Sequence, residues 1–191
     1  PTNIGREALF SYLVAVSVAL VGIGPHAIHL AAAVVGFLTV PATYLVAEAL
    51  FREAREPLRT YGGPISALAL TVSFWHQHWS RYGVRAILVP LLTALTLWAL
   101  ARMLRAPTPR QRTAYAAVTG GCLGLSLYTY QSARALPLLV GLIALIAITG
   151  WRAWSRRTVG DLLLLIGVTA LTFAPMGLYF LRHPGIGSER I

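Results

Sequence analysis

The amino-acid sequence predicts an all-α, polytopic membrane protein, and three features of the chain lead to this fold class. Of the 191 residues, 57% are hydrophobic and 12% are charged, and the mean hydropathy is +0.67. Soluble domains carry about 25% charged residues, so this composition is typical of a membrane protein. Several uncharged runs approach the roughly 20 residues that a helix needs to cross a bilayer. None of them alternates apolar and polar residues as the strands of a membrane barrel do.

The chain begins with a short polar segment and an apolar segment, residues 8–24, which ends in Gly22 and Gly24 before Pro25. The apolar segment suits either a brief span or a helix that lies at the membrane interface. Six firmer spans follow, at about residues 28–50, 63–80, 84–104, 113–131, 134–151 and 159–181.

Proline and glycine positions add detail to these spans. The prolines inside them are Pro41, Pro90, Pro137 and Pro175. Because neighbouring helices can satisfy the carbonyl groups that a proline frees, these positions predict kinks rather than breaks. Gly120 and Gly124 lie four residues apart on one helix face, a spacing that predicts the close approach of a second helix.

The charge of the chain predicts its orientation. The net charge is +10 and all 16 basic residues are arginine, which in a membrane protein indicates loops that meet lipid phosphates rather than a nucleic-acid partner. On alternate sides of the six spans, ten arginines lie on one side and six on the other, and the richer side is expected to be cytoplasmic. The ten are Arg52, Arg55, Arg59, Arg102, Arg105, Arg110, Arg112, Arg152, Arg156 and Arg157. The six are Arg6, Arg81, Arg85, Arg134, Arg182 and Arg190.

Residues 76–85 form the most unusual stretch, a polar and aromatic turn with two arginines and two histidines between two apolar runs. The arginine count places this turn on the outer face, together with residues 131–134 and the C-terminal residues. Arginine recognises phosphate through paired hydrogen bonds, and several arginines around a cleft of low dielectric would hold a phosphate or diphosphate. The predicted phosphate-binding or donor-binding residues are Arg6, Arg81, Arg85, Arg134, Tyr128, Tyr130 and Gln131. Candidates next to this site are Glu7, His78 and His183.

An alternative interpretation is that each arginine only extends to the lipid head groups. The residues themselves predict no metal ligand, because the chain has no zinc spacing of Cys and His and no pair of acids on one helix. It also has no glycine-rich phosphate loop with lysine. The one cysteine, Cys122, lies inside an apolar run, where we expect it to serve as a packing residue.

Several segments, taken in their order and spacing relative to the spans, are similar to one known family. They are residues 5–10 (GREALF), 42–51 (ATYLVAEALF), 80–88 (SRYGVRAIL), 124–134 (GLSLYTYQSAR) and 179–184 (YFLRHP). The chain resembles GT-C-type membrane glycosyltransferases of the family-39-like group, which includes lipid A aminoarabinose transferases and protein O-mannosyltransferases. The resemblance implies transfer of a sugar from a polyprenyl-phosphate donor to a lipid, glycan or protein acceptor, at the extracytoplasmic face of the cell membrane.

The resemblance also leads to expectations about sequence outside residues 1–191 and about the layout of the chain. Such enzymes carry a catalytic acid in an outer loop that would precede Pro1, so we expect a fragment of a longer protein without that acid. In the lipid A relatives a Glu-Lys pair helps to bind metal and phosphate where this chain has Gly5 and Arg6, and the use of a divalent metal as cofactor stays open. The expected layout of residues 1–191 is one partial GT-C transmembrane domain. It comprises an outer juxtamembrane segment (1–25), about six spans (28–181) and the start of an outer loop (182–191).

Two other functions remain as alternatives to the transferase. A transporter or lipid flippase predicts functional polar groups near the middle of the bilayer. Glu48 and Asp161 lie instead at the ends of predicted spans. The third function is that of a non-catalytic membrane scaffold.

Overall fold

The computed structural model describes residues 9–150 and 156–182 of the chain. Within these two ranges the structure contains helices and no strand, which confirms the all-α class. The α-helices are α1 (Leu9–Val21), α2 (Pro25–Phe51), α3 (Leu58–Val72), α4 (Phe74–Tyr82), α5 (Leu88–Leu104), α6 (Pro109–Ser126), α7 (Leu136–Gly150) and α8 (Arg156–Arg182). Two 3-10 turns, η1 (Arg85–Ile87) and η2 (Gln131–Ala135), precede α5 and α7.

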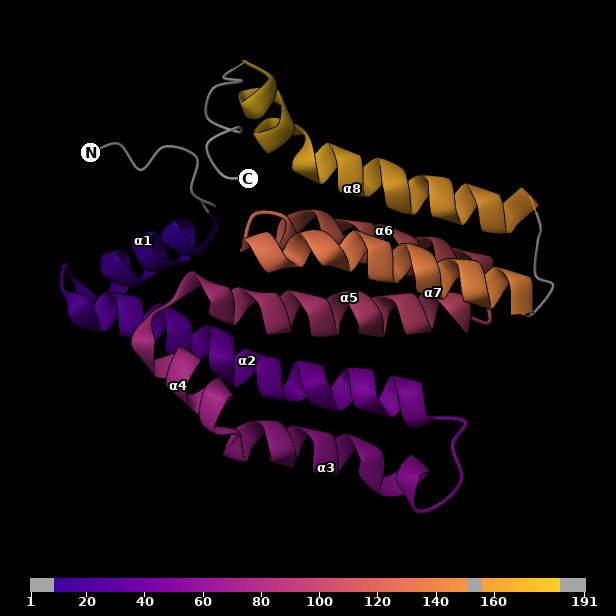
Figure 1. Cartoon of the computed structure of the whole chain (residues 1–191), viewed down its shortest axis with the longest axis horizontal. Helices are drawn as coiled ribbons and strands as arrows, with labels where there is room; N and C mark the ends of the chain where they lie inside the picture. The colour runs from indigo at the N-terminus through magenta and orange to yellow at the C-terminus, as the bar shows by residue number, and fades with distance from the viewer. Residues whose placement is uncertain (1–8, 151–155, 183–191) are drawn as a thin grey trace.

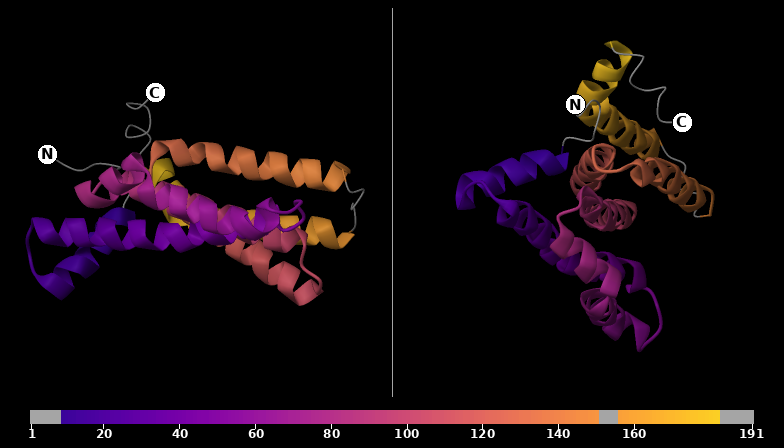
Figure 2. Two further views of the ribbon diagram at one scale, coloured as in Figure 1. Left: turned by 90° about the horizontal axis from the view of Figure 1, so that it is seen from below. Right: turned by 60° about the vertical axis from the view of Figure 1, so that its left-hand side comes forward.

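The long helices lie side by side and alternate in direction along the chain (Figures 1 and 2). At one end of the bundle α2, α5 and α7 end, while α3, α6 and α8 begin. We call this the arginine-rich end, since it holds Arg52, Arg105 and Arg112. At the opposite end, called the turn end, lie α4 and the first residues of α5. The two predicted groups of loops are therefore at opposite ends of the described bundle.

In the described part of the chain, three helices are long and apolar enough to cross a membrane, and they cover residues Pro25–Phe51, Arg85–Leu104 and Thr158–Tyr179. Large apolar side chains on the outside of the bundle agree with a lipid environment. Phe37 on α2, Leu138 on α7 and Leu171 on α8 are 75%, 78% and 75% exposed, respectively. Apolar surface of this extent on helices that satisfy their own backbone groups suits contact with lipid.

The other three predicted spans correspond to shorter or less apolar helices. The span predicted at 63–80 is divided into α3 and α4, and α7 has 15 residues. The span predicted at 113–131 corresponds to α6, which begins earlier, in the polar segment after Thr108, and also ends earlier, at Ser126.

The division between α3 and α4 occurs at Ser73, whose backbone is extended with φ −65° and ψ 121°. The break leaves the carbonyl group of Thr71 without its helical donor, and the side-chain amide Nε2 of Gln77 donates to this oxygen at 2.8 Å. The carbonyl of Ser73 in turn accepts from the backbone N–H of Gln77 at 3.0 Å, which starts α4. Gln77 thereby stabilises a bend where an unbroken span was predicted.

The four prolines fall into two classes. Pro41 and Pro175 lie inside α2 and α8, as predicted. Pro90 and Pro137 lie instead in the first turns of α5 and α7. The N–H groups of a first turn have no partner within the helix, so proline costs little there. These two prolines begin helices rather than kink them, which corrects the prediction.

Gly120 and Gly124 allow α6 and α8 to pack closely, as their spacing predicted. A Cβ atom at Gly120 would lie 2.5 Å from the carbonyl oxygen of Leu165, and one at Gly124 would lie 2.6 Å from Cβ of Thr172. The hydroxyl of Thr169 crosses the same contact and donates to the carbonyl of Gly120 at 3.2 Å. Close helix packing is therefore the role of this glycine pair.

Helix α1 lies across the turn end and joins a small core there. Its residue Phe10 is buried with Ala31, Ala32 and Val35 of α2 and with Ile87 and Leu88 of the η1–α5 segment. A helix of 13 residues is about 20 Å long, well below the thickness of a bilayer core of about 30 Å. This length favours an interfacial helix over a brief span.

Candidate functional site

A cavity of about 570 Å³ lies at the turn end, where α3, α4, the start of α5 and the α6–α7 connection meet. We call it the turn-end cavity. Its polar and aromatic lining comes from Trp75, His76, Trp79, Tyr130 and Ser132. The apolar lining comes from Leu70, Val84, Ala86, Ile87, Val89 and Pro90, and Ser73 completes the wall. The cavity thus combines an apolar interior with aromatic residues.

Helix α4 presents its two faces to different surroundings. Trp75 and Trp79 are one helical turn apart and both line the turn-end cavity, together with His76. The Nε2 atom of His76 lies 3.1 Å from the carbonyl oxygen of Gly36, which ties α4 to α2. His78 is on the other face, stacked on the ring of Tyr82 with 4.3 Å between ring centroids. The predicted neighbour His78 therefore does not line the cavity.

Gly83 ends α4 and turns the chain toward Arg85. Its φ of +70° lies in the left-handed region that favours glycine. A Cβ atom at this position would also lie 2.3 Å from Cγ2 of Ile28 on α2. Both the conformation and the contact thus require glycine at the turn that positions η1.

Arg85 and Tyr130 are the predicted site residues that the structure brings together. The guanidinium carbon of Arg85 lies 5.7 Å from the centroid of the Tyr130 ring, within range of a cation–π contact. Arg85 is half-buried, and Tyr130 is 42% exposed and lines the turn-end cavity. This pair places a positive charge beside an apolar cavity.

The remaining predicted residues have other surroundings. Arg81, Gln131 and Arg134 are exposed, and none of them lines the turn-end cavity. Arg6, Glu7 and His183 lie outside the described residues.

Tyr128 connects α6 to α8 rather than to the cavity. Its hydroxyl donates to the carbonyl of Thr172 at 2.9 Å and accepts from the backbone N–H of Met176 at 3.3 Å. In a regular helix that N–H would donate directly to that carbonyl. The hydroxyl is therefore inserted into the hydrogen-bond ladder of α8 next to Pro175, where Figure 1 shows the helix bending.

Negative charge is absent from the turn end within the described residues. The four described carboxylates, Glu48, Glu53, Glu56 and Asp161, all belong to segments at the arginine-rich end. The described ranges also contain no cluster of His, Cys, Asp and Glu suited to a metal ion. The turn-end cavity can attract an anion through Arg85, and its described lining offers no carboxylate base.

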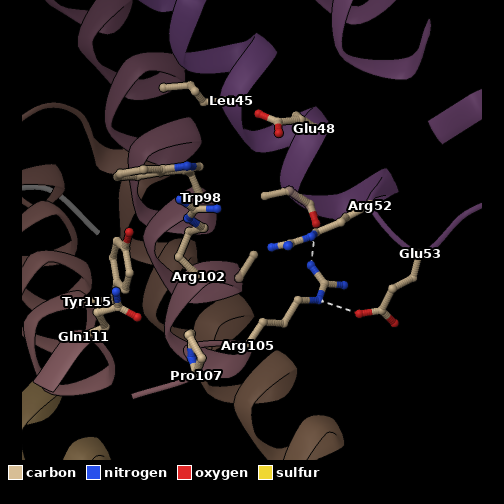
Figure 3. Close-up of a pocket in the computed structure, with 12 residues that line it drawn as sticks. Leu45, Glu48, Arg52, Glu53, Trp98, Arg102, Arg105, Pro107, Gln111 and Tyr115 are labelled. Carbon is tan, nitrogen blue, oxygen red and sulfur yellow. Dashed lines mark hydrogen bonds and ion pairs between the residues drawn. The ribbon is translucent and has the colours of Figure 1, made fainter. Parts of the chain in front are cut away.

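The arginine-rich end has its own cavity, of about 560 Å³, between the ends of α2 and α5 and the start of α6 (Figure 3). Glu48, Arg52, Trp98, Arg102 and Tyr115 contribute to its lining. No site was predicted at these residues, because loop arginines at this end were attributed to membrane orientation and to contact with lipid phosphates.

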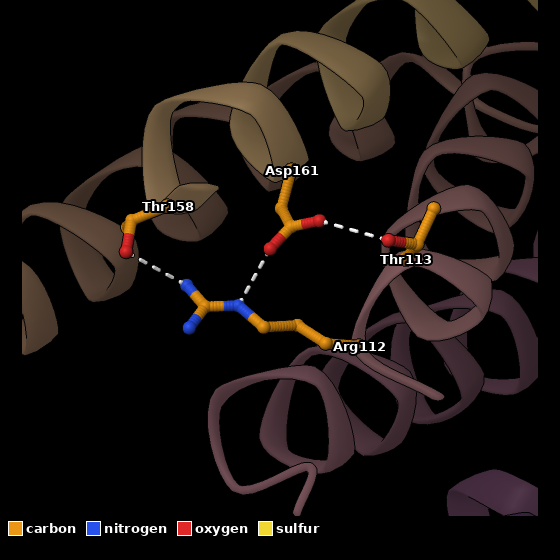
Figure 4. A network of polar contacts seen from close by, with 4 residues as sticks. All are labelled: Arg112, Thr113, Thr158 and Asp161. Carbon is orange, nitrogen blue, oxygen red and sulfur yellow. Dashed lines mark hydrogen bonds and ion pairs between the residues drawn. The ribbon is translucent and has the colours of Figure 1, made fainter. Parts of the chain in front are cut away.

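A buried ion pair also lies at the arginine-rich end, between α6 and α8 (Figure 4). Nε of Arg112 is 2.7 Å from Oδ2 of Asp161, which is 5% exposed. Nη2 of Arg112 donates to the Thr158 hydroxyl at 3.0 Å, and the Thr113 hydroxyl donates to Oδ1 of Asp161 at 3.2 Å. The carboxylate of Asp161 is thus neutralised by partners on α6.

Comparisons with known proteins add no family to these observations. The chain matches no protein-family model, and no curated protein or solved structure matches it.

Proposed function

We propose that the chain is part of the transmembrane domain of a GT-C-type glycosyltransferase that uses a polyprenyl-phosphate sugar. The observation that carries this proposal is the position of Arg85 beside the turn-end cavity, 5.7 Å from the ring of Tyr130. A lipid-linked phosphate combines an anion with an apolar chain. Arg85 is not part of the cavity lining, but through Tyr130 it places a cation next to that apolar and aromatic lining. That the donor carries a sugar, and that this sugar is transferred, is inferred from the resemblance to family-39-like enzymes.

In the proposed membrane arrangement, α2, α3–α4, η1–α5, α6, η2–α7 and α8 each cross the bilayer. The arginine-rich end faces the cytoplasm, in keeping with ten of the 16 arginines on that side. The turn end and its cavity then face the outside. Aromatic residues of α4, including Trp75 and Trp79, suit the level of the lipid head groups.

The proposed reaction transfers the sugar in one displacement. An acceptor oxygen attacks the anomeric carbon, the bond from that carbon to the phosphate oxygen breaks, and polyprenyl phosphate leaves with the electron pair. Arg85 stabilises the charge that develops on the leaving phosphate, in a site partly screened from water. The proton of the acceptor passes to a base, which the family resemblance places before Pro1. No step is assigned to a metal, because the described turn-end residues include no carboxylate ligand.

The charges of the described residues favour this function over a transporter. A transported ion or substrate needs polar groups that are free to bind it near the middle of the bilayer. The buried carboxylate of Asp161 is instead held by Arg112 and Thr113 at one end of the bundle. This network fastens α6 to α8 and engages the carboxylate of Asp161.

The proposal is tested by turnover of a polyprenyl-phosphate sugar by the full-length protein. Removal of a charge that stabilises the leaving phosphate is expected to lower the rate about 100-fold in Arg85→Ala. Arg182→Ala is the matched control, because Arg182 is exposed at the same end of the bundle and lies on α8, which contributes no residue to the cavity, whereas Val84 and Ala86 on either side of Arg85 both line it. Equal rates in the two variants would exclude the assigned role of Arg85.

The proposed orientation has a separate test. The variant Tyr82→Cys, in a Cys122→Ala background, is expected to react with an impermeant maleimide added to intact cells, because Tyr82 is 65% exposed at the turn end. Labelling only in permeabilised cells would show that the turn end faces the cytoplasm and would contradict the proposed orientation.

A further inference from the structure

The cavity at the arginine-rich end is lined by charged side chains, and some of them have no ion-pair partner among the described residues. Arg105 already has partners, since its Nε lies 3.0 Å from Oε1 of Glu53 and its Nη1 donates to the carbonyl of Ala49. Arg52 and Glu48, by contrast, have no ion-pair partner among residues 9–150 and 156–182. Figure 3 shows Glu48, on α2, and Arg52, the residue after α2, on the opposite side of the cavity from Arg102 on α5.

Aromatic side chains fix the other wall of this cavity. The guanidinium carbon of Arg102 lies 5.8 Å from the centroid of the Tyr115 ring. Tyr115 meets Trp98 edge to face, with 5.8 Å between centroids. A cation held on an aromatic ring keeps its N–H groups available at the ring edge, so Arg102 retains donors for an anion. Arg52, just after α2, and Arg102 on α5 therefore face one space together with the carboxylate of Glu48. The ion pair of Arg105 and Glu53 also lines this space.

An apolar groove adjoins this cavity. The groove has a volume of about 420 Å³ and lies between the ends of α2, α5 and α7, with Leu50, Leu97, Leu104 and Ile143 in its lining. Ala101 and Arg105 line both spaces, so the charged cavity and the groove share a wall. A ligand that spans both spaces must join a charged head to an apolar chain.

We propose that this double cavity binds a membrane lipid whose phosphodiester headgroup carries a hydroxyl or ammonium donor beyond the phosphate. The phosphate lies between Arg52 and Arg102, whose guanidinium groups suit its oxygens. The hydroxyl or ammonium group donates to the carboxylate of Glu48, and an acyl chain occupies the apolar groove. Basic pockets between membrane helices at the cytoplasmic level are suited to such head groups. The site is separate from the turn-end cavity and does not depend on the proposed transferase activity.

The lipid site is tested by native mass spectrometry of the protein in detergent, with an equimolar mixture of phosphatidylglycerol, phosphatidylethanolamine and phosphatidylcholine that have identical acyl chains. Adducts of the first two lipids are expected to exceed those of phosphatidylcholine, whose choline group has no donor for Glu48. Glu48→Gln is expected to reduce this preference while phosphate binding persists. Equal adducts of all three lipids in the unmodified protein would overturn the assignment of the headgroup.

Variants of the arginines locate the binding. Arg52→Gln with Arg102→Gln is expected to weaken phosphatidylglycerol binding at least about 10-fold, the order expected for charge-assisted bonds to a phosphate. Arg52→Gln alone is expected to give a smaller loss and preserves the fold, since Arg52 is exposed. Arg55→Gln with Arg59→Gln removes the same charge from exposed positions outside the cavity and serves as the control. Equal losses in both double variants would show a general charge effect and contradict the site.

A competition experiment separates a lipid from a soluble phosphodiester. Glycerophosphoglycerol has the headgroup chemistry without acyl chains, and in 100-fold excess it is expected to leave most of the phosphatidylglycerol bound. Full displacement would assign the site to a water-soluble phosphodiester and reject the role of the apolar groove.

Discussion

The contact between α6 and α8 depends on the absence of a side chain at Gly120, and the neighbouring Gly121 provides an internal comparison. A Cβ atom at Gly120 would lie 2.5 Å from the carbonyl oxygen of Leu165 and 3.0 Å from Cβ of Val168. A Cβ atom at Gly121 would have no neighbour within 4 Å. The same substitution at two consecutive positions of α6 therefore tests the packing directly.

The expected magnitudes follow from these contacts. In Gly120→Ala the obstacle is backbone of α8, which must move away from α6, and such overpacking costs about 1–3 kcal/mol. Gly121→Ala adds a methyl group in open space and gains helix propensity, about 0.5–1 kcal/mol. The two variants should therefore differ in free energy of unfolding by about 1.5–4 kcal/mol, with opposite signs relative to the unmodified protein.

Reversible unfolding by sodium dodecyl sulfate in mixed micelles, followed by circular dichroism, measures both free energies of unfolding. A lower unfolding midpoint is expected for Gly120→Ala, and a higher one for Gly121→Ala. Two variants of equal stability would refute the close approach of α6 to α8.

Two further stability predictions concern polar links between α6 and α8. Asp161→Asn is expected to cost about 2–4 kcal/mol in the same assay, because it leaves the guanidinium of Arg112, whose side chain is 23% exposed, without its counter-charge. Glu56→Gln, at an exposed position, is its control, and equal stabilities of the two variants would show that the ion pair does not stabilise the fold. Tyr128→Phe is expected to cost about 1–2 kcal/mol, because two backbone groups of α8 lose their hydroxyl partner. Tyr130→Phe should change little, and a larger effect at position 130 would contradict the inserted hydroxyl.

Local sequence signals predicted much of the fold. The apolar runs located the helices, and the spacing of Gly120 and Gly124 predicted a close helix contact that the structure contains. The break at Ser73 carries no glycine or proline signal. It depends on the side chain of Gln77 and on the carbonyl of Gly36, which contacts His76 from another helix. Tertiary contacts of this kind cannot be inferred from a single segment.

The candidate site, too, was predicted only in part from the sequence. Residues 76–85 and 128–134 were predicted to meet at one end, and Arg85 does lie beside Tyr130 there. Tyr128 and Tyr130 are two residues apart, yet one is inserted into α8 and the other lines the turn-end cavity. The turn after α6 separates them, and no periodicity applies across it. No site role was predicted for Trp75 and Trp79, because the direction of α4 follows from the break at Ser73.

The proposed transferase acts on a lipid-linked donor at the turn end, and vesicles of defined orientation test this claim most directly. Right-side-out and inside-out vesicles that contain the full-length protein and its native acceptors would receive a labelled polyprenyl-phosphate sugar. Right-side-out vesicles are expected to release polyprenyl phosphate and to label an acceptor. Absence of turnover in both preparations, or turnover in inside-out vesicles alone, would contradict this claim.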